Sequence, residues 1–207
     1  MNTSPTFLRN RKTGKPVEAE ICDEITDEHI RLWHSTWMPI VAKAETELQR
    51  RGIPRDQWPQ DLHWKWDDKT AWSRKVWALK RYSLMCEGAL QGLMLINLAK
   101  YSRLTTQVGW HIAHVEFVAT APWNRPDLCD QPTFRGVGQT LMRTAIEVSR
   151  AESYRGRIGL HSLPQANEFY QKVCGMTNLG PDRSYDDLVY YEMTETQADA
   201  FCAPPQA

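Results

Sequence analysis

The residues best able to do chemistry lie in two segments of the chain. The segment HVEFVATAP (114–122) has the pattern of a strand, and because His114 and Glu116 are two positions apart, they share one face of it. The segment FRGVGQTLM (134–142) places two glycines where a helix begins after a strand. Small residues there let a phosphate approach, and backbone amides and the helix dipole attract it. This segment therefore predicts a phosphate-bearing ligand, with an ordinary glycine-rich helix start as the alternative.

Residue spacing argues against several other chemistries. The dinucleotide fingerprint GxGxxG fails because Leu141 occupies the place of its third glycine, and GxxxxGK[ST] has no match. His111 and His114 would point to opposite faces of a strand, so we expect no metal site there. The five cysteines are scattered without a CxxC pair, which predicts reduced thiols, and Cys129 has no evident base partner for a nucleophilic role.

Composition excludes further classes. The chain has 207 residues, and its 25 basic and 25 acidic residues cancel, which argues against a strongly basic nucleic-acid coat or an acidic tail. No uncharged stretch is long enough for a membrane-spanning helix, and the N-terminal residues lead into no apolar signal region. We therefore expect a cytoplasmic protein that does not associate with membranes.

The elements that must position these residues form one predicted domain. Residues 1–15 are polar and basic and are expected to be frayed, whereas 16–80 are expected to be mainly helical. Residues 81–194 predict a meander of three strands, followed by helix, strand, helix and strand, and 195–207 a C-terminal tail. The predicted fold class is α/β (α+β), with a mixed, mostly antiparallel twisted sheet flanked by helices.

The helical part has its own start and interruption signals. Apolar residues between Ile30 and Leu48 recur at spacings of three and four, which is typical of one helix face, and Thr26 or Asp27 is placed to cap the helix. Pro39 either kinks one long helix or begins a second one at its first position.

Two motifs in order resemble one superfamily. Residues 135–140 (RGVGQT) resemble the [QR]xxGx[GA] pyrophosphate loop of the GNAT superfamily of acetyl-CoA-dependent N-acetyltransferases. Downstream, RIGLHSLPQANEFYQKVCGM resembles the superfamily's next strand and helix. The matching positions there are Ala166, Phe169, Tyr170, Gly175 and Met176. The resemblance covers about residues 80–193 and implies the GNAT fold and acetyl-CoA as co-substrate.

The sequence departs from the superfamily pattern at three places. Thr140 stands where Gly or Ala is usual, and Leu163 stands where many members carry an Asn. Residues 123–134 are an insertion beside the expected cofactor loop, and their role stays open.

Acetyl transfer to an amine requires a base because a lysine-like amine is mostly ammonium at pH 7. The resemblance implies that Glu116 is this base; His114, an unidentified group or simple desolvation are the alternatives. It also implies that Tyr170 protonates the departing thiolate, with a core aromatic as its alternative role. The implied cofactor-binding residues, which hold the thioester, the pantetheine arm or the pyrophosphate mainly through backbone amides, are Val118, Ala119, Thr120, Arg135, Gly136, Val137, Gly138, Gln139 and Thr140.

The acceptor amine is expected near the tryptophans. Five of the nine tryptophans lie between Trp58 and Trp77, and basic residues outnumber acidic ones between Arg50 and Arg81. Basic residues interleaved with aromatics favour single-stranded nucleic acid or an anionic acceptor, whereas packing in the core is the alternative. Three functions stay open: acetylation of a small-molecule or peptide amine, acetylation of aminoacyl-tRNA, and acyl-CoA binding without turnover. A homodimer also stays open.

Overall fold

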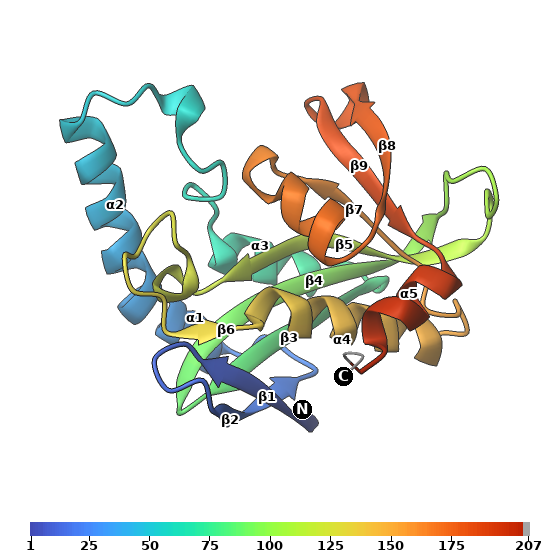
Figure 1. Ribbon diagram of the computed structural model, residues 1–207, viewed down its shortest axis with the longest axis horizontal. Helices are drawn as coiled ribbons and strands as arrows, with labels where there is room; N and C mark the ends of the chain where they lie inside the picture. Colours follow the sequence, from blue (N-terminus) through green and yellow to red (C-terminus); the bar gives the residue numbers. More distant parts are fainter. Residues whose placement is uncertain (205–207) are drawn as a thin grey trace. The chain divides into compact units, whose positions relative to one another are not determined.

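The computed structural model describes residues 1–204 (Figure 1). The chain forms two compact units, of which the first comprises residues 1–94 and 118–140 and the second 95–117 and 141 onward. The sequence predicted one domain whose helical part ends near residue 80. The units instead divide at residues 94/95 and 117/118, within the strands that span residues 89–101 and 111–120, and at 140/141.

The described residues form nine strands: β1 (Thr3–Asn10), β2 (Pro16–Cys22), β3 (Leu79–Cys86), β4 (Ala89–Tyr101), β5 (His111–Thr120), β6 (Phe134–Arg135), β7 (Ile158–Ser162), β8 (Thr177–Asp182) and β9 (Leu188–Met193). The α-helices are α1 (Asp27–Leu32), α2 (Met38–Arg50), α3 (Trp66–Ser73), α4 (Val137–Ala151) and α5 (Glu195–Cys202).

The first unit holds the strand order β6-β1-β2-β3 followed by the first half of β4. Its helical part begins at a capping box, in which the Thr26 hydroxyl accepts from the His29 backbone N–H and the His29 ring accepts from that of Thr26. A π-helical turn at Trp33–Trp37 connects α1 to α2, and Pro39 lies in the first turn of α2. The backbone therefore stays helical from α1 through the π-turn into α2, with Pro39 as the second residue of α2. Of the two predicted caps, Thr26 is the one that caps α1.

The expectation that residues 1–15 are frayed is wrong. Strand β1 pairs antiparallel with β2 along its length and with β6 at its end, and Leu8 is buried. The turn that reverses the chain is held by Asn10, whose side-chain oxygen accepts from Lys12 and Thr13, and by Gly14 at φ +69°. The polar composition was misleading because most of the strand's other side chains are exposed.

The second unit holds the strand order β4 (second half)-β5-β7-β9-β8. β5 and β7 are parallel, whereas β7 with β9 and β8 with β9 are antiparallel. The predicted mixed, mostly antiparallel sheet flanked by helices is therefore confirmed.

The predicted C-terminal tail is wrong for residues 195–202, which form α5. Thr194 and Gln197 make a capping box, and Asp199 pairs with Arg150 of α4. Residues 205–207 lie outside the described part of the chain. No helix within residues 1–204 is long and apolar enough to cross a membrane.

Candidate active site

One face of the second unit's sheet collects a row of polar side chains. The register aligns His114 of β5 with Gly159 of β7, and His161 of β7 with Tyr190 of β9. The Tyr190 ring centroid lies 6.1 Å from that of His114 and 4.7 Å from that of His161. Glu116 continues the row beyond His114, as the two-residue spacing predicts.

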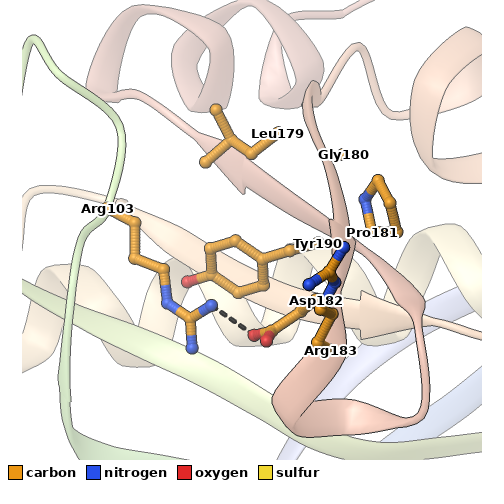
Figure 2. Close-up of a pocket in the computed structure, with 7 residues that line it drawn as sticks. All are labelled: Arg103, Leu179, Gly180, Pro181, Asp182, Arg183 and Tyr190. Atoms are coloured by element: carbon orange, nitrogen blue, oxygen red, sulfur yellow. Dashed lines mark hydrogen bonds and ion pairs between the residues drawn. The ribbon is translucent and has the colours of Figure 1, made fainter.

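A cavity of about 310 Å³ opens beside this row (Figure 2). Its lining residues are Arg103, Leu179, Gly180, Pro181, Asp182, Arg183 and Tyr190. The Arg103 guanidinium pairs with the Asp182 carboxylate and lies over the Tyr190 ring, 4.4 Å from its centroid. Hydrogen bonds from Arg103, His161 and the Ser184 backbone hold the pKa of Asp182 well below its usual range. Asp182 is therefore a fixed negative charge at the cavity wall.

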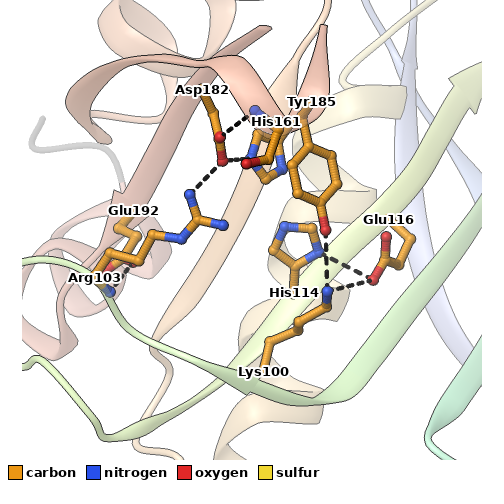
Figure 3. Close-up of polar contacts among 9 residues, drawn as sticks. Lys100, Arg103, His114, Glu116, His161, Asp182, Tyr185 and Glu192 are labelled. Atoms are coloured by element: carbon orange, nitrogen blue, oxygen red, sulfur yellow. Dashed lines mark hydrogen bonds and ion pairs between the residues drawn. The ribbon is translucent and has the colours of Figure 1, made fainter. Parts of the chain in front are cut away.

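Three polar side chains surround Oε1 of Glu116, and Figure 3 shows two of them, His114 and Lys100. Asn97 Nδ2 donates to it at 2.8 Å, His114 Nδ1 lies 3.5 Å away and Lys100 Nζ lies 4.0 Å away. Lys100 also donates to the Tyr185 hydroxyl at 3.1 Å. The Glu116 side chain is only 14% exposed, so these partners replace most of its contact with water.

The environment of Glu116 favours its ionised form. Burial alone raises the pKa of this carboxyl, but the His114 ring, the Asn97 hydrogen bond and the Lys100 charge together outweigh burial and lower the pKa below its ordinary value. Among the described residues Oε2 accepts no hydrogen bond. Glu116 therefore presents one charged, uncommitted oxygen at neutral pH.

The two imidazoles of the row are deeply buried, with 4% and 6% of their side chains exposed for His114 and His161. Their ring centroids lie 5.4 Å apart. His161 Nε2 lies 2.9 Å from Asp182 Oδ2, and the Tyr185 ring stacks on His161 at 3.8 Å. Among the described residues, both nitrogens of His114 and Nδ1 of His161 lack a hydrogen bond. Such buried nitrogens are rare and point to a bound water or a functional role.

Gly159 leaves room for this row. A Cβ at this position would lie 2.7 Å from the Tyr190 hydroxyl and 2.8 Å from Ile112 Cδ1. We expect Gly159→Ala to displace the Tyr190 ring and lower the free energy of unfolding by about 1–3 kcal/mol, as overpacking does. Urea unfolding measures the loss, and adding Tyr190→Phe should restore part of it. Equal stability of Gly159→Ala and the wild type would contradict this packing.

Tyr170 lies on a separate element of the second unit. It is buried in the π-helical segment Phe169–Val173, and its ring centroid lies 5.2 Å from Phe169 and 6.1 Å from Tyr191. These contacts are those of a core aromatic, so its role at a thiolate stays a prediction.

The predicted cofactor residues belong to the first unit. Val118, Ala119 and Thr120 continue β5 directly after the row that bears Glu116. Gly136 has φ +93° and lies in open space, since no heavy atom is within 4 Å of the position that a Cβ would take, and α4 begins at the next residue. Arg135 is exposed beside it. Only glycine adopts this backbone easily, so the loop exposes backbone amides at a helix start.

Several residues of the site were missed in the sequence. Asn97 and Lys100 lie in β4, and Asp182 and Tyr185 lie in and after β8, far along the chain from His114. The only local signal was a set of polar residues interrupting the apolar run of β4, and nothing local links His161 to Asp182.

The tryptophan-rich segment contains both buried and exposed rings. Trp66 of α3 is 2% exposed, which agrees with packing in the core, whereas Trp72 is 45% and Trp77 is 88% exposed. Lys69 Nζ lies 4.8 Å from the Trp64 ring centroid, and burial lowers the pKa of Lys69 to about 8. At least one basic residue of this segment, Lys69, therefore packs against a tryptophan ring.

The 123–134 insertion is tied to this segment within the first unit. Arg125 pairs with Asp61 and also with Asp127 inside the insertion. The Trp123 ring packs edge-on against Trp37, with centroids 6.3 Å apart. The insertion thus packs on the helical part of its own unit.

Residues 1–204 contain no group of side chains arranged for metal binding, and their cysteines form no disulfide. No group of three or more His, Cys, Asp or Glu residues there is placed to hold a metal ion, and the five cysteines are unpaired thiols. His111 is exposed and stacks on Tyr154 at 5.1 Å, away from the row of His114.

Comparison with known proteins supports the fold. No family model matches the chain, and no curated protein matches its sequence. A GNAT-family acetyltransferase from Listeria monocytogenes 4b F2365 is 13% identical, with 91% of this chain and 99% of that chain covered and a TM-score of 0.54. The PaiA N-acetyltransferase of Thermoplasma acidophilum, solved in complex with coenzyme A, is 13% identical, with 85% and 98% covered and a TM-score of 0.51. The chain has the fold of the GNAT acetyltransferases.

Proposed function

We propose that the chain is an N-acetyltransferase that moves an acetyl group from acetyl-CoA directly to a primary amine. The observation that carries this proposal is the buried, ionised Glu116, which keeps one oxygen uncommitted on the strand that continues into Val118–Thr120. Direct transfer needs a base for the amine, donors for an oxyanion and a proton for the departing thiolate. The GNAT fold supports the same reaction class.

The first unit has residues that fit coenzyme A. Gly136, with its positive φ and open surroundings, and the amides at the start of α4 would hold the pyrophosphate, and Arg135 would add a charge-assisted hydrogen bond. Val118, Ala119 and Thr120 would hold the pantetheine arm and the thioester carbonyl through their backbone. When bound, the coenzyme supplies the acetyl group as a thioester.

The residues of the second unit would accept the proton of the amine and donate a proton to the thiolate. Glu116 Oε2 would accept a proton from the acceptor ammonium, and Asn97 and Lys100 keep Glu116 oriented through Oε1. Tyr170 is proposed to give a proton to the thiolate. Direct transfer needs no covalent intermediate with the protein, so it needs no cysteine nucleophile beside Glu116, His114 and His161.

The proposal is tested in two steps on the full chain. Acetyl-CoA should raise the melting temperature, and a panel of amines should then release free coenzyme A thiol in the presence of the protein. The panel includes small amines, peptides and aminoacyl-tRNA because Trp72 and Trp77 are exposed in the basic segment. A thermal shift without turnover would favour an acyl-CoA-binding protein, and the absence of any shift would remove the cofactor assignment.

A glycine substitution checks the pyrophosphate loop separately. Gly136→Val places a β-branched side chain at φ +93°, a strained conformation that also fills the space beside the amides. We expect the thermal shift by acetyl-CoA to disappear and the dissociation constant to rise at least about tenfold, since one lost charge-assisted contact is worth about that much. Isothermal titration measures it. The control is Gly14→Val, which is equally strained at φ +69° in the β1–β2 turn; equal loss of binding in both variants would contradict the loop assignment.

A further inference from the structure

A row of buried titratable side chains leads from Glu116 to the cavity. Glu116 Oε1 lies 3.5 Å from His114 Nδ1, the rings of His114 and His161 are 5.4 Å apart, and His161 Nε2 lies 2.9 Å from Asp182 Oδ2 (Figure 3). Asp182 lines the cavity. Every member of the row can donate or accept a proton, and the two rings between the carboxylates are almost fully buried.

Glu116 alone is poorly suited to keep the proton it takes. An acceptor amine with a pKa of about 10.4 holds its proton roughly a millionfold more tightly than an ordinary carboxylate, and the neighbours of Glu116 lower its pKa further. A base works best when its pKa lies near the working pH. Glu116 is therefore expected to pass the proton on to a neighbouring group.

His161 is built to receive a proton at Nδ1. Burial lowers the pKa of His161, assisted by His114 and Arg103, although Asp182 opposes the shift. The ring is therefore neutral at pH 7, and Nε2 is the nitrogen that donates to Asp182. Nδ1 is then the accepting nitrogen, and it is buried without a hydrogen bond among the described residues. The titratable and charged groups that face the two rings are Glu116 of β5, Lys100 of β4, Arg103 after β4, Asp182 of β8, Tyr185 after β8, and Tyr190 of β9.

We propose that His114 and His161 form a proton relay that carries the acceptor amine's proton from Glu116 to the cavity at Asp182. The relay rests on the proposed transferase function and deepens it. The N–H bond of the ammonium breaks as Glu116 takes the proton on Oε2, and rotation of the neutral carboxyl turns this proton toward His114 Nδ1, which accepts it. His114 then releases its Nε2 proton through a bridging water, and His161 accepts a proton at Nδ1. Asp182 stabilises the resulting imidazolium, which releases its Nε2 proton to solvent in the cavity. Nothing is oxidised or reduced.

The separation of the two rings requires one bridging group. A spacing of 5.4 Å with an angle of 56° between the ring planes gives no direct hydrogen bond between them. One water molecule held by the unpartnered nitrogens would close the gap and would satisfy these buried polar atoms, as buried waters commonly do.

The first test needs no substrate. Nitrogen-15 spectra of histidine-labelled protein report the charge and tautomer of each ring. The relay requires His161 to be neutral at pH 7 with its proton on Nε2, and Asp182→Asn should change this tautomer balance. A charged His161 at pH 7, or a proton resident on Nδ1, would overturn the relay because Nδ1 could not accept.

The second test uses turnover with whichever amine the wild type acetylates. His161→Ala should lower kcat at pH 7 at least about tenfold, the loss should shrink above pH 9, and free imidazole should restore much of the rate. Asp182→Asn, which keeps the side-chain shape, should shift the pH profile in the same direction if His161→Ala folds poorly. His111→Ala, a histidine of the same strand outside the row, should leave the rate unchanged.

The outcomes separate the relay from the proposed function. Turnover by the wild type with an unchanged pH profile in both variants defeats the relay and leaves the transferase standing. An equal loss at every pH without imidazole rescue also defeats it, since that is the behaviour of a structural residue. No turnover by the wild type with any amine defeats the proposed function and the relay together.

Discussion

Glu116→Gln should lower kcat at pH 7 by a factor of about 10²–10⁴, the usual contribution of a positioned base. The amide keeps the shape of the side chain and its contact with Asn97 but cannot take a proton from the acceptor. Because the pKa of Glu116 is lowered, the carboxylate is ionised at every pH above its ordinary range. The deficit should therefore shrink only as the acceptor amine loses its proton unaided, near pH 10. Steady-state rates from pH 6 to 10 measure both effects.

The control for this prediction is Glu152→Gln, the same substitution at an exposed glutamate of the second unit. It should leave rate and pH profile unchanged. The thermal shift by acetyl-CoA should be the same in wild type and Glu116→Gln, because the proposed cofactor residues lie elsewhere. An unchanged pH profile in Glu116→Gln would assign the base role to His114 or to solvent.

Local signals in the sequence predicted the middle of the chain well. The turn at Glu87–Gly88 has positive φ angles at both residues, which glycine favours although glutamate does not, and β3, β4 and β5 follow the apolar runs around it. The glycine pair of residues 136 and 138 predicted the start of α4 correctly. These features depend on neighbouring residues, so composition and spacing suffice to find them.

The missed elements depend on partners far along the chain. Strand β8 has the sequence TNLGPD, in which no residue is buried and apolar residues do not alternate with polar ones, and its place in the sheet comes from pairing with β9. Because β8 was not predicted, the contact between Asp182 and His161, which are 21 positions apart, was not predicted either. Helix α5 did carry a readable signal, since Thr194 and Gln197 match the capping-box spacing.

The candidate site was therefore only half visible in the sequence. Spacing on one strand gave His114 and Glu116, but strand register decides what faces them. Gly159 illustrates this, because its missing side chain matters only once β9 brings the Tyr190 hydroxyl over it. The sequence singled out Glu116 as a candidate, and the strand register determines which side chains surround it.

Glu192 anchors the loop that carries Arg103, and Glu192→Ala should lower the free energy of unfolding by about 3–5 kcal/mol. Its carboxylate is fully buried on β9 and accepts from the Ser102 hydroxyl, from the backbone N–H groups of Arg103 and Leu104, at 2.5 and 3.1 Å, and from Gln107 Nε2 at 3.2 Å. Alanine leaves four donors without their acceptor, and each buried unpaired donor costs about 1–3 kcal/mol before the loop relaxes. Urea unfolding measures the loss.

Glu192→Gln separates hydrogen bonding from packing. It keeps one acceptor oxygen and the side-chain volume, so its loss should be roughly half that of alanine, whereas exposed Glu152→Ala should change stability by less than about 0.5 kcal/mol. A loss in Glu192→Ala no larger than in Glu152→Ala would contradict the anchoring role. The same loop brings Arg103 to Asp182, whose carboxylate also contacts His161. Glu192→Gln should therefore also weaken the hydrogen bond between Asp182 and His161. The His161 tautomer balance in nitrogen-15 spectra would then change without any substitution in the row itself.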